Sequence, residues 1–178
     1  DSTGKIVIPA VYERATNFHE NFAAVRLNGK WLYIDVNNKT RFSLDCNYAY
    51  EFSNGLAMIQ KGLYYGYIDL AGELVIPAIY EKAHSFSEGL ASAKKNGKWG
   101  VIDRNNEIKI PFKYALIGQF SEGRCNFQSS GEFGLKWGYF APNGKMIIPP
   151  TFDKCYPFSE GRAIFREGAF KGGSYGYI

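Results

Sequence analysis

The sequence has few of the residues that carry most enzyme chemistry, with 2 histidines, 3 cysteines and 2 methionines among 178 residues. His19 and His84 have no cysteine or histidine at the spacing of a metal site. Charge of one sign is also scarce, because 21 basic and 17 acidic residues alternate along the chain. No basic stripe tracks a phosphate backbone, so nucleic acid is not an expected partner. No apolar run approaches the length of a membrane span.

Aromatic residues, by contrast, make up 17% of the chain and recur at fixed positions. Phe18, Phe52, Phe86 and Phe120 lie 34 residues apart, each opening a phrase close to Phe-Ser-Glu-Gly, and Phe158 follows after 38. A phrase Ile-Pro-x-x-aromatic precedes most of these copies. A third slot holds Trp or Tyr, usually followed by Gly. Its five copies are Trp31-Leu32, Tyr65-Gly66, Trp99-Gly100, Trp137-Gly138 and Tyr175-Gly176. Self-similarity at such a period indicates a repeat architecture.

The three linked phrases resemble the WG-repeat family, also called KWG repeats, over the full chain. Gly97-Lys98-Trp99-Gly100 and Lys136-Trp137-Gly138 carry the resemblance best, together with Gly29-Lys30-Trp31. The resemblance implies a bacterial repeat protein, often part of a larger chain and usually without an assigned activity, and it carries no catalytic residues.

Three positions depart from the WG-repeat pattern: Leu32, Ser43 and Cys46. We therefore expect the first two repeats to pack less regularly than the others.

The third copy shows what one repeat predicts. Residues 90–95 and 98–102 read as antiparallel strands, because Asn96-Gly97 suits a two-residue turn with positive φ at both positions. Asp103 opens a second turn, and 107–110 reads as a third strand that ends at Pro111. Alternation in that strand predicts Ile108 and Ile110 inward. The segment that links one unit to the next is a candidate for a single helical turn.

The predicted fold is all-β: a tandem repeat of five three-stranded antiparallel meanders forming an open twisted array. A five-bladed closed propeller-like ring is the alternative, with residues 5–9 completing the final unit. We expect one WG-repeat domain over 1–178, with repeats near 1–34, 35–68, 69–102, 103–140 and 141–178. Because the chain starts at Asp1 without an initiator Met, we expect it to be part of a larger protein.

The remaining reactive residue types have structural explanations. Cys125 and Cys155 fill slots that hold alanine in other repeats, which predicts free, buried thiols. Each repeat Asp opens a turn, where Asp caps its own backbone. The string Gly172-Gly173-Ser174-Tyr175-Gly176 matches that of serine hydrolases but lies in a hairpin, with no helix after it. No complete catalytic constellation is present, so we expect no enzyme activity and no cofactor or metal.

Two functions follow from these observations. The first is a non-catalytic β-repeat scaffold that binds another protein, since loops of stacked repeats vary without harming the core. The second is a carbohydrate or cell-wall ligand module that uses aromatic platforms. Exposure of Trp31, Trp99 and Trp137 separates the two, because core packing buries these rings and ligand stacking exposes them.

The candidate partner site comes from hairpin length. From the small slot to the aromatic, repeats four and five run four residues longer than the others, as Cys125 to Trp137 and Ala163 to Tyr175 show. Each longer tip places a Phe in a polar, Gly-containing loop. The candidate binding residues are Glu132, Phe133, Phe170 and Lys171, while the aromatic slots and Gly100, Gly138 and Gly176 are expected to be structural. Neutral loop drift is the alternative interpretation of the two tips.

Overall fold

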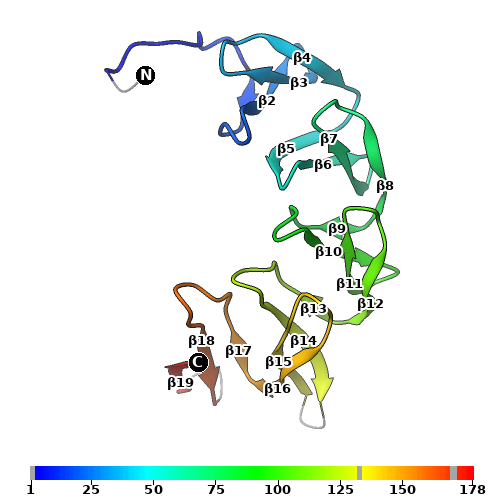
Figure 1. Ribbon diagram of the computed structural model, residues 1–178, viewed down its shortest axis with the longest axis vertical. Coiled ribbons are helices and arrows are strands. Elements are labelled where there is room, and N and C mark those ends of the chain that lie inside the picture. Colours follow the sequence, from blue (N-terminus) through cyan, green and yellow to red (C-terminus); the bar gives the residue numbers. More distant parts are fainter. Residues whose placement is uncertain (1–2, 132–133, 169–171) are drawn as a thin grey trace. The chain divides into compact units, whose positions relative to one another are not determined.

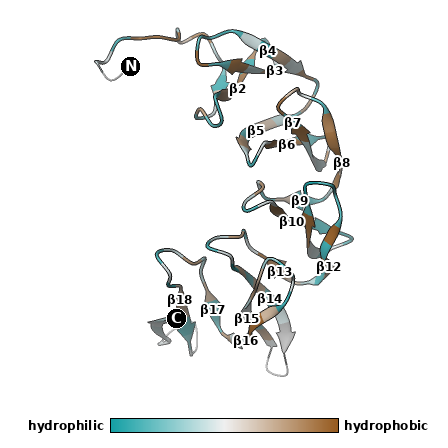
Figure 2. Ribbon diagram, viewed as in Figure 1, coloured by the Kyte–Doolittle hydropathy of each residue, from teal (hydrophilic) through white to brown (hydrophobic). Residues whose placement is uncertain are grey.

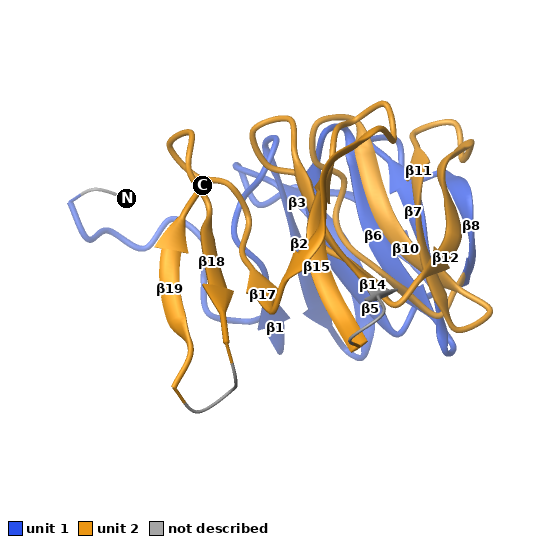
Figure 3. Cartoon of the chain, turned by 90° about the horizontal axis from the view of Figure 1, so that it is seen from below, with its two compact units in different colours: residues 1–79 blue, residues 80–178 orange. Residues whose placement is uncertain are grey.

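The computed structural model describes residues 3–131, 134–168 and 172–178. Nineteen strands form five separate antiparallel sheets, and the described residues contain no helix. None of the five sheets closes on itself. The all-β tandem fold predicted from the repeats is thereby confirmed. The chain divides into two compact units, residues 1–79 and 80–178 (Figure 3).

Unit 1 contains two sheets of four strands each (Figure 1). The first consists of β1 (Arg14–Ala15), β2 (Phe22–Leu27), β3 (Lys30–Asp35) and β4 (Thr40–Leu44). The second consists of β5 (Tyr48–Ser53), β6 (Leu56–Lys61), β7 (Tyr64–Asp69) and β8 (Leu74–Tyr80). In both sheets the strands lie in chain order, so each neighbour in sequence is a neighbour in space.

Unit 2 contains three sheets built in the same way. The first has β9 (Lys82–Ala83), β10 (Leu90–Lys95), β11 (Lys98–Asp103) and β12 (Ile108–Tyr114). The second has β13 (Leu116–Ile117), β14 (Cys125–Gly131), β15 (Gly134–Phe140) and β16 (Met146–Phe152). The third has β17 (Lys154–Cys155), β18 (Ile164–Glu167) and β19 (Ser174–Tyr177).

Four of the sheets have one strand more than the predicted meander. The added strand comes from the segment that links successive repeats. In β9, Lys82 and Ala83 pair with Lys94 and Ala93 of β10. In three of these sheets the added strand has only two residues, which are too few to show an alternating pattern in the sequence.

The turns follow the predicted local chemistry. Asn96 and Gly97 have φ of 52° and 73°, as a primed two-residue hairpin turn requires. Asp103 Oδ1 accepts from the backbone N–H of Asn105 and Glu107, each at 2.9 Å, so this carboxylate caps its own loop. Asn106, with φ of 64°, takes the left-handed position that closes it.

The Phe-Ser-Glu-Gly phrase is a turn rather than the helical turn suggested by the sequence. Ser87 and Leu90 form a bridge around Glu88 and Gly89, whose φ values are 55° and 77°. Positive φ at both central residues makes this a primed hairpin turn, which suits the antiparallel segments on either side. The helical prediction is therefore wrong.

Pro111 does not end its strand, contrary to the prediction. Strand β12 continues through it to Tyr114, because Trp99 pairs with Tyr114 and Val101 pairs with Ile110, leaving extra residues in a bulge. Proline is tolerated at a bulge on an outer strand, where its missing N–H interrupts no ladder.

The same irregular register corrects the facing of two isoleucines. Ile110 pairs with Val101 and is 1% exposed, whereas Ile108 pairs with Ile102 and is 63% exposed. Because Val101 and Ile102 point to opposite faces, the two isoleucines cannot share one face. Ile108 therefore does not point inward, as simple alternation predicted.

The bulge also explains the Gly of the Trp-Gly slot. A Cβ on Gly100 would lie 2.8 Å from the carbonyl oxygen of Ile110 and 2.9 Å from the Phe112 ring. A Cβ on Gly66 would lie 2.6 Å from the carbonyl oxygen of Ile76. Glycine at this position therefore allows the neighbouring backbone to approach closely, which is a structural role.

Apolar side chains from adjacent sheets form the cores within each unit. Hydrophobic residues are not confined to the middle strands, since the outer strand β8 is also strongly hydrophobic (Figure 2). In unit 1, Trp31 and Tyr33 of the first sheet pack with Phe52 and Ile68 of the second. In unit 2, Trp99 packs in a cluster that spans its first two sheets. A sheet of three or four strands is marginal alone, so stacking against its neighbour supplies the core.

Candidate functional site

The aromatic slots differ in burial. Trp31 is 3% exposed and Trp99 is 7% exposed, whereas Tyr65 and Trp137 are half-buried. Tyr175, in β19, is 63% exposed. Two of the three tryptophans therefore lie within the core, as the scaffold interpretation expects.

Polar atoms of the buried aromatics tie each sheet to the next link. The Trp31 Nε1–H donates to the carbonyl oxygen of Asn47 at 3.0 Å. The Tyr139 hydroxyl donates to the carbonyl oxygen of Tyr156 at 2.7 Å. These bonds satisfy the polar end of a large buried ring, so the aromatics serve both packing and inter-sheet connection.

The Phe-Ser-Glu-Gly turns form a second connection. The Glu88 carboxylate accepts from the backbone N–H of Gly123 at 3.0 Å, and the Glu122 carboxylate accepts from that of Gly161 at 2.8 Å. Ser87 Oγ donates to the carbonyl oxygen of Phe120 at 2.9 Å. Each of these two turns thus binds the equivalent turn that follows it, which gives Ser87, Glu88 and Glu122 a structural role.

The cysteines are free, and Cys125 and Cys155 are buried as predicted. Burial raises the pKa of the Cys155 thiol to about 11 and raises that of Cys125 further. Burial, followed by the nearby Asp45 charge, also raises the pKa of Cys46 to about 11. All three thiols are therefore protonated near neutral pH, which is the opposite of an activated nucleophile.

His84 is held within the core of unit 2. Its ring stacks on Trp99 with centroids 5.1 Å apart, and its Nδ1 lies 2.8 Å from Ser92 Oγ. Ser92 Oγ in turn donates to the carbonyl oxygen of Gly118 at 2.6 Å. Burial lowers the pKa of His84. The imidazole is thus neutral near pH 7 and engaged in packing.

The described residues contain no group of three or more His, Cys, Asp or Glu side chains placed to hold a metal ion. Within the same ranges, no helix is long and apolar enough to cross a membrane. Ser174, in the hydrolase-like string, lies in strand β19.

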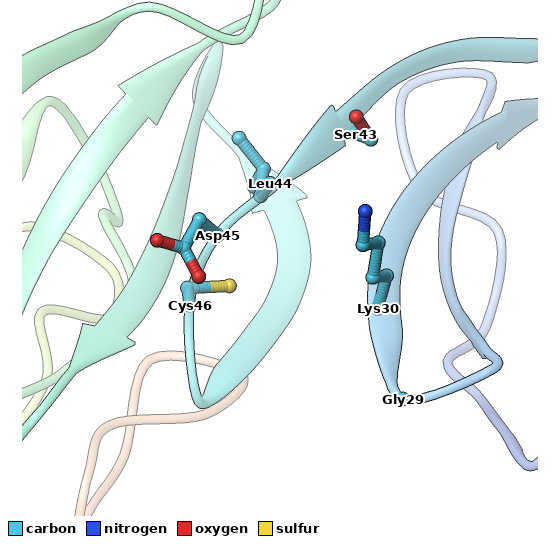
Figure 4. A pocket seen from close by; sticks show the side chains of 6 residues that line it. All are labelled: Gly29, Lys30, Ser43, Leu44, Asp45 and Cys46. Carbon is cyan, nitrogen blue, oxygen red and sulfur yellow. The ribbon is translucent and has the colours of Figure 1, made fainter.

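A hollow of about 270 Å³ lies in unit 1, where the repeat pattern breaks. Lys30 lies on one side, and Asp45 and Cys46 lie on the other, after the end of β4 (Figure 4). Gly29, Ser43 and Leu44 complete the lining. Drug-sized ligands occupy roughly 300–1,000 Å³. The hollow is therefore slightly smaller than the pockets that usually hold such ligands.

The hollow arises from two linked departures in one sheet. Leu32 stands in the Gly slot and pairs directly with Ser43, which stands in the Pro slot, so β3 and β4 run in register from Trp31 to Tyr33. Because β4 lacks the bulge that β12 has after Ile110, the strand ends at Leu44. Cys46 then occupies the position at which other repeats have an aromatic ring. The departures are visible in the sequence, but the pairing of Leu32 with Ser43 is known only from the register of the two strands.

A hairpin tip with exposed apolar residues adjoins the hollow. Asn47, next to Cys46, accepts from the Gly62 N–H through its Oδ1 at 2.6 Å. Gly62 has φ of 62° and precedes Leu63, which is 80% exposed, and Tyr64, which is 47% exposed. Gly at the first central position of the turn allows an ordinary residue at the second. We call residues 62–64 the β6–β7 tip; sequence reasoning overlooked it.

The residues predicted to bind a partner, Glu132, Phe133, Phe170 and Lys171, lie outside the described part of the chain. Strands β14 and β15, which flank the first pair, are seven residues long, against six for β10 and β11. The longer hairpin of repeat four is therefore a real feature of its sheet.

Comparison with solved structures finds β-propeller-like folds. Hsv2 from Kluyvelomyces marxianus has a TM-score of 0.57 at 10% identity, with 87% of this chain and 60% of that chain covered. A eukaryotic initiation factor has a TM-score of 0.60 at 11% identity, with 97% and 54% covered. The chain thus spans little more than half the length of these structures, and the likeness shows the fold alone. No curated protein matches the sequence.

The sequence family gives a closer relationship. A model of the WG containing repeat matches residues 1–31, 33–62, 65–99, 99–131 and 137–169. These matches cover most of the chain and include the aromatic residue of the first four slots and the Phe-Ser-Glu-Gly turns. The chain therefore belongs to the WG-containing repeat family.

Proposed function

We propose that this chain is a non-catalytic repeat scaffold that binds another protein. The observation that carries the proposal is the β6–β7 tip, where Leu63 is 80% exposed beside Tyr64 and next to the hollow. Exposed apolar residues grouped around a hollow are typical of contact sites, whereas single ones are common on any surface. The tip and the hollow together make the candidate binding surface of unit 1.

The roles of the motif residues support a scaffold rather than a catalyst. Asp103 caps its own turn, Glu88 and Glu122 join successive turns, and Ser87 bonds a backbone carbonyl. Each of these polar groups serves the backbone of the repeat. Binding then depends on the positions at which the repeats differ in sequence.

Burial of Trp31 and Trp99 favours a protein partner over a carbohydrate. Stacking on a sugar requires an open ring face, which Trp31 and Trp99 do not provide at 3% and 7% exposure. Leu63, the most exposed residue of the tip, has no ring to stack on a sugar, but it suits an apolar contact with a protein.

A binding screen with two classes of ligand tests this function. The chain is immobilised and presented in parallel with a phage-displayed library of random peptides and with an array of oligosaccharides that includes cell-wall fragments. We expect enrichment of peptides that share a pattern and no retained sugar. Retained oligosaccharides without peptide enrichment would replace the proposal with the carbohydrate module.

The two longer hairpins remain the second candidate contact, on sequence grounds. If Phe133 and Phe170 are anchors, the variants F133A and F170A keep the wild-type melting temperature. Each variant then weakens the binding of a selected peptide by more than about 1 kcal/mol. Unchanged affinity in both variants would assign the longer tips to neutral variation.

A further inference from the structure

The outer edge of the first sheet differs from the outer edges of the next three. Strands β8, β12 and β16 are the last strands of their sheets, and they contain Pro77, Pro111 and Pro149. Proline and an irregular register are common means of blocking a sheet edge, because they interrupt its row of backbone donors and acceptors. These three edges are therefore poor templates for a further strand.

Strand β4 lacks the proline, and its one register irregularity lies at its start, between the pairs Tyr33–Phe42 and Ile34–Thr40. It is the last strand of its sheet, it contains Ser43 in the proline slot, and it pairs with β3 without a shift from Trp31 to Tyr33. Thr40, Arg41 and Ser43 are exposed. No backbone hydrogen bond from outside the sheet reaches Arg41 to Leu44 among the described residues. A regular strand of this kind presents unpaired N–H and C=O groups along its outer side.

The hollow lies at the end of this edge and carries charge. Lys30 lines it, and Lys61 lies close enough to act on the Cys46 thiol. Neither ammonium group forms an ion pair with a described residue. Asp45 is the one acidic residue of the lining. Glu13 also lies near the hollow, since it accepts from the Gly29 N–H, but it pairs with Arg26. With two further ammonium groups and one further carboxylate, the local charge favours an acidic side chain in a ligand.

We propose that β4 accepts an extended peptide segment of a partner as an additional strand, with an acidic side chain of that segment at Lys30. The inference rests on the proposed protein-binding function and specifies its mode. Backbone bonds to β4 supply affinity, and the hollow beside the β6–β7 tip supplies selectivity, as in other cases of strand addition.

The test restores the common repeat pattern in this sheet. The double variant L32G/S43P introduces the proline and the Gly that accommodates its bulge, and L32G alone is the matched control with an unchanged edge. The probe is a fluorescein-labelled hexapeptide of alternating threonine and valine with one glutamate, together with its glutamine counterpart. Binding is measured by fluorescence polarisation, and folding by thermal melting.

We expect the glutamate peptide to bind wild type and L32G, and to bind L32G/S43P at least about tenfold more weakly. The glutamine peptide should bind wild type several-fold more weakly than the glutamate peptide. If the double variant does not fold, amide exchange on wild type decides: the peptide should slow exchange within residues 41–44.

Equal binding to L32G and L32G/S43P, no binding to wild type, or unchanged exchange in β4 would overturn the proposal. A wild-type dimer that becomes monomeric in L32G/S43P, measured by sedimentation, would also overturn it, because a second copy would then occupy the edge. If peptides from the display library still bind in any of these cases, the protein-binding function stands and only the strand-addition mode fails.

Discussion

At the scale of single residues, the repeat motif is explained by what each side chain does for the backbone. Trp31 and Tyr139 donate to carbonyl groups of the following link, and Glu88 and Glu122 accept from the following turn. These bonds recur because successive repeats have the same donor and acceptor groups at equivalent positions. The Ser, Glu and Asp side chains of this motif therefore have structural roles in the repeat.

Replacing Trp99 by Ala tests the core role of the aromatic slot. Trp99 is 7% exposed and packs with Leu90, Tyr114 and Ile117. We expect W99A to lower the free energy of unfolding by about 3–5 kcal/mol, as large-to-small core changes do. Denaturant unfolding measures it, and a loss below about 1 kcal/mol would show that the ring lies outside the core.

The thiols should react in an order set by burial. Cys46 is half-buried, whereas Cys125 and Cys155 are buried. Burial raises all three pKa values, so little thiolate is present at neutral pH. With a thiol reagent at pH 7.5, we expect Cys46 to be modified first and the other two only after denaturant is added. Rapid native labelling of Cys125 and Cys155 would place them at the surface.

At the scale of elements, the sequence predicts most reliably what local chemistry determines. The turn at Asn96 and Gly97 was predictable because a two-residue hairpin needs positive φ at both positions. The end of β12 and the facing of Ile108 were not, since both depend on a bulge that forms only against β11. The hollow was not predictable either, because it requires the register of β4 and the bond from Gly62 to Asn47.

The Gly and Pro of one sheet should behave as a coupled pair. A Cβ at Gly100 would meet the Ile110 carbonyl and the Phe112 ring, so we expect G100A to cost about 1–3 kcal/mol of stability, in the range of overpacked cores. Adding P111S should recover part of the loss by relaxing the bulge, as Leu32 and Ser43 coexist in the first sheet. Equal losses in G100A and G100A/P111S, measured by denaturant melts, would show that the two positions are independent.

At the scale of the whole molecule, five sheets share one strand order, and the departures from the repeat pattern distinguish them. The first sheet lacks the Gly and the Pro, and the second has Leu63 and Tyr64 at its tip. Both departures lie in unit 1 and meet at Asn47, which bonds both Trp31 and Gly62. The shared pattern therefore builds the stacked sheets, and we propose that the departures form a binding surface.

The most direct test of this central claim uses a peptide obtained from the phage-display selection. Its affinity is measured for wild type and for the variant L63S/Y64K. K98S is the matched control, because Lys98 holds in the β10–β11 hairpin the position that Tyr64 holds in its own. The account predicts that L63S/Y64K keeps the wild-type melting temperature and binds at least about tenfold more weakly, while K98S binds as wild type. Wild-type affinity in L63S/Y64K, or an equal loss in K98S, would contradict it.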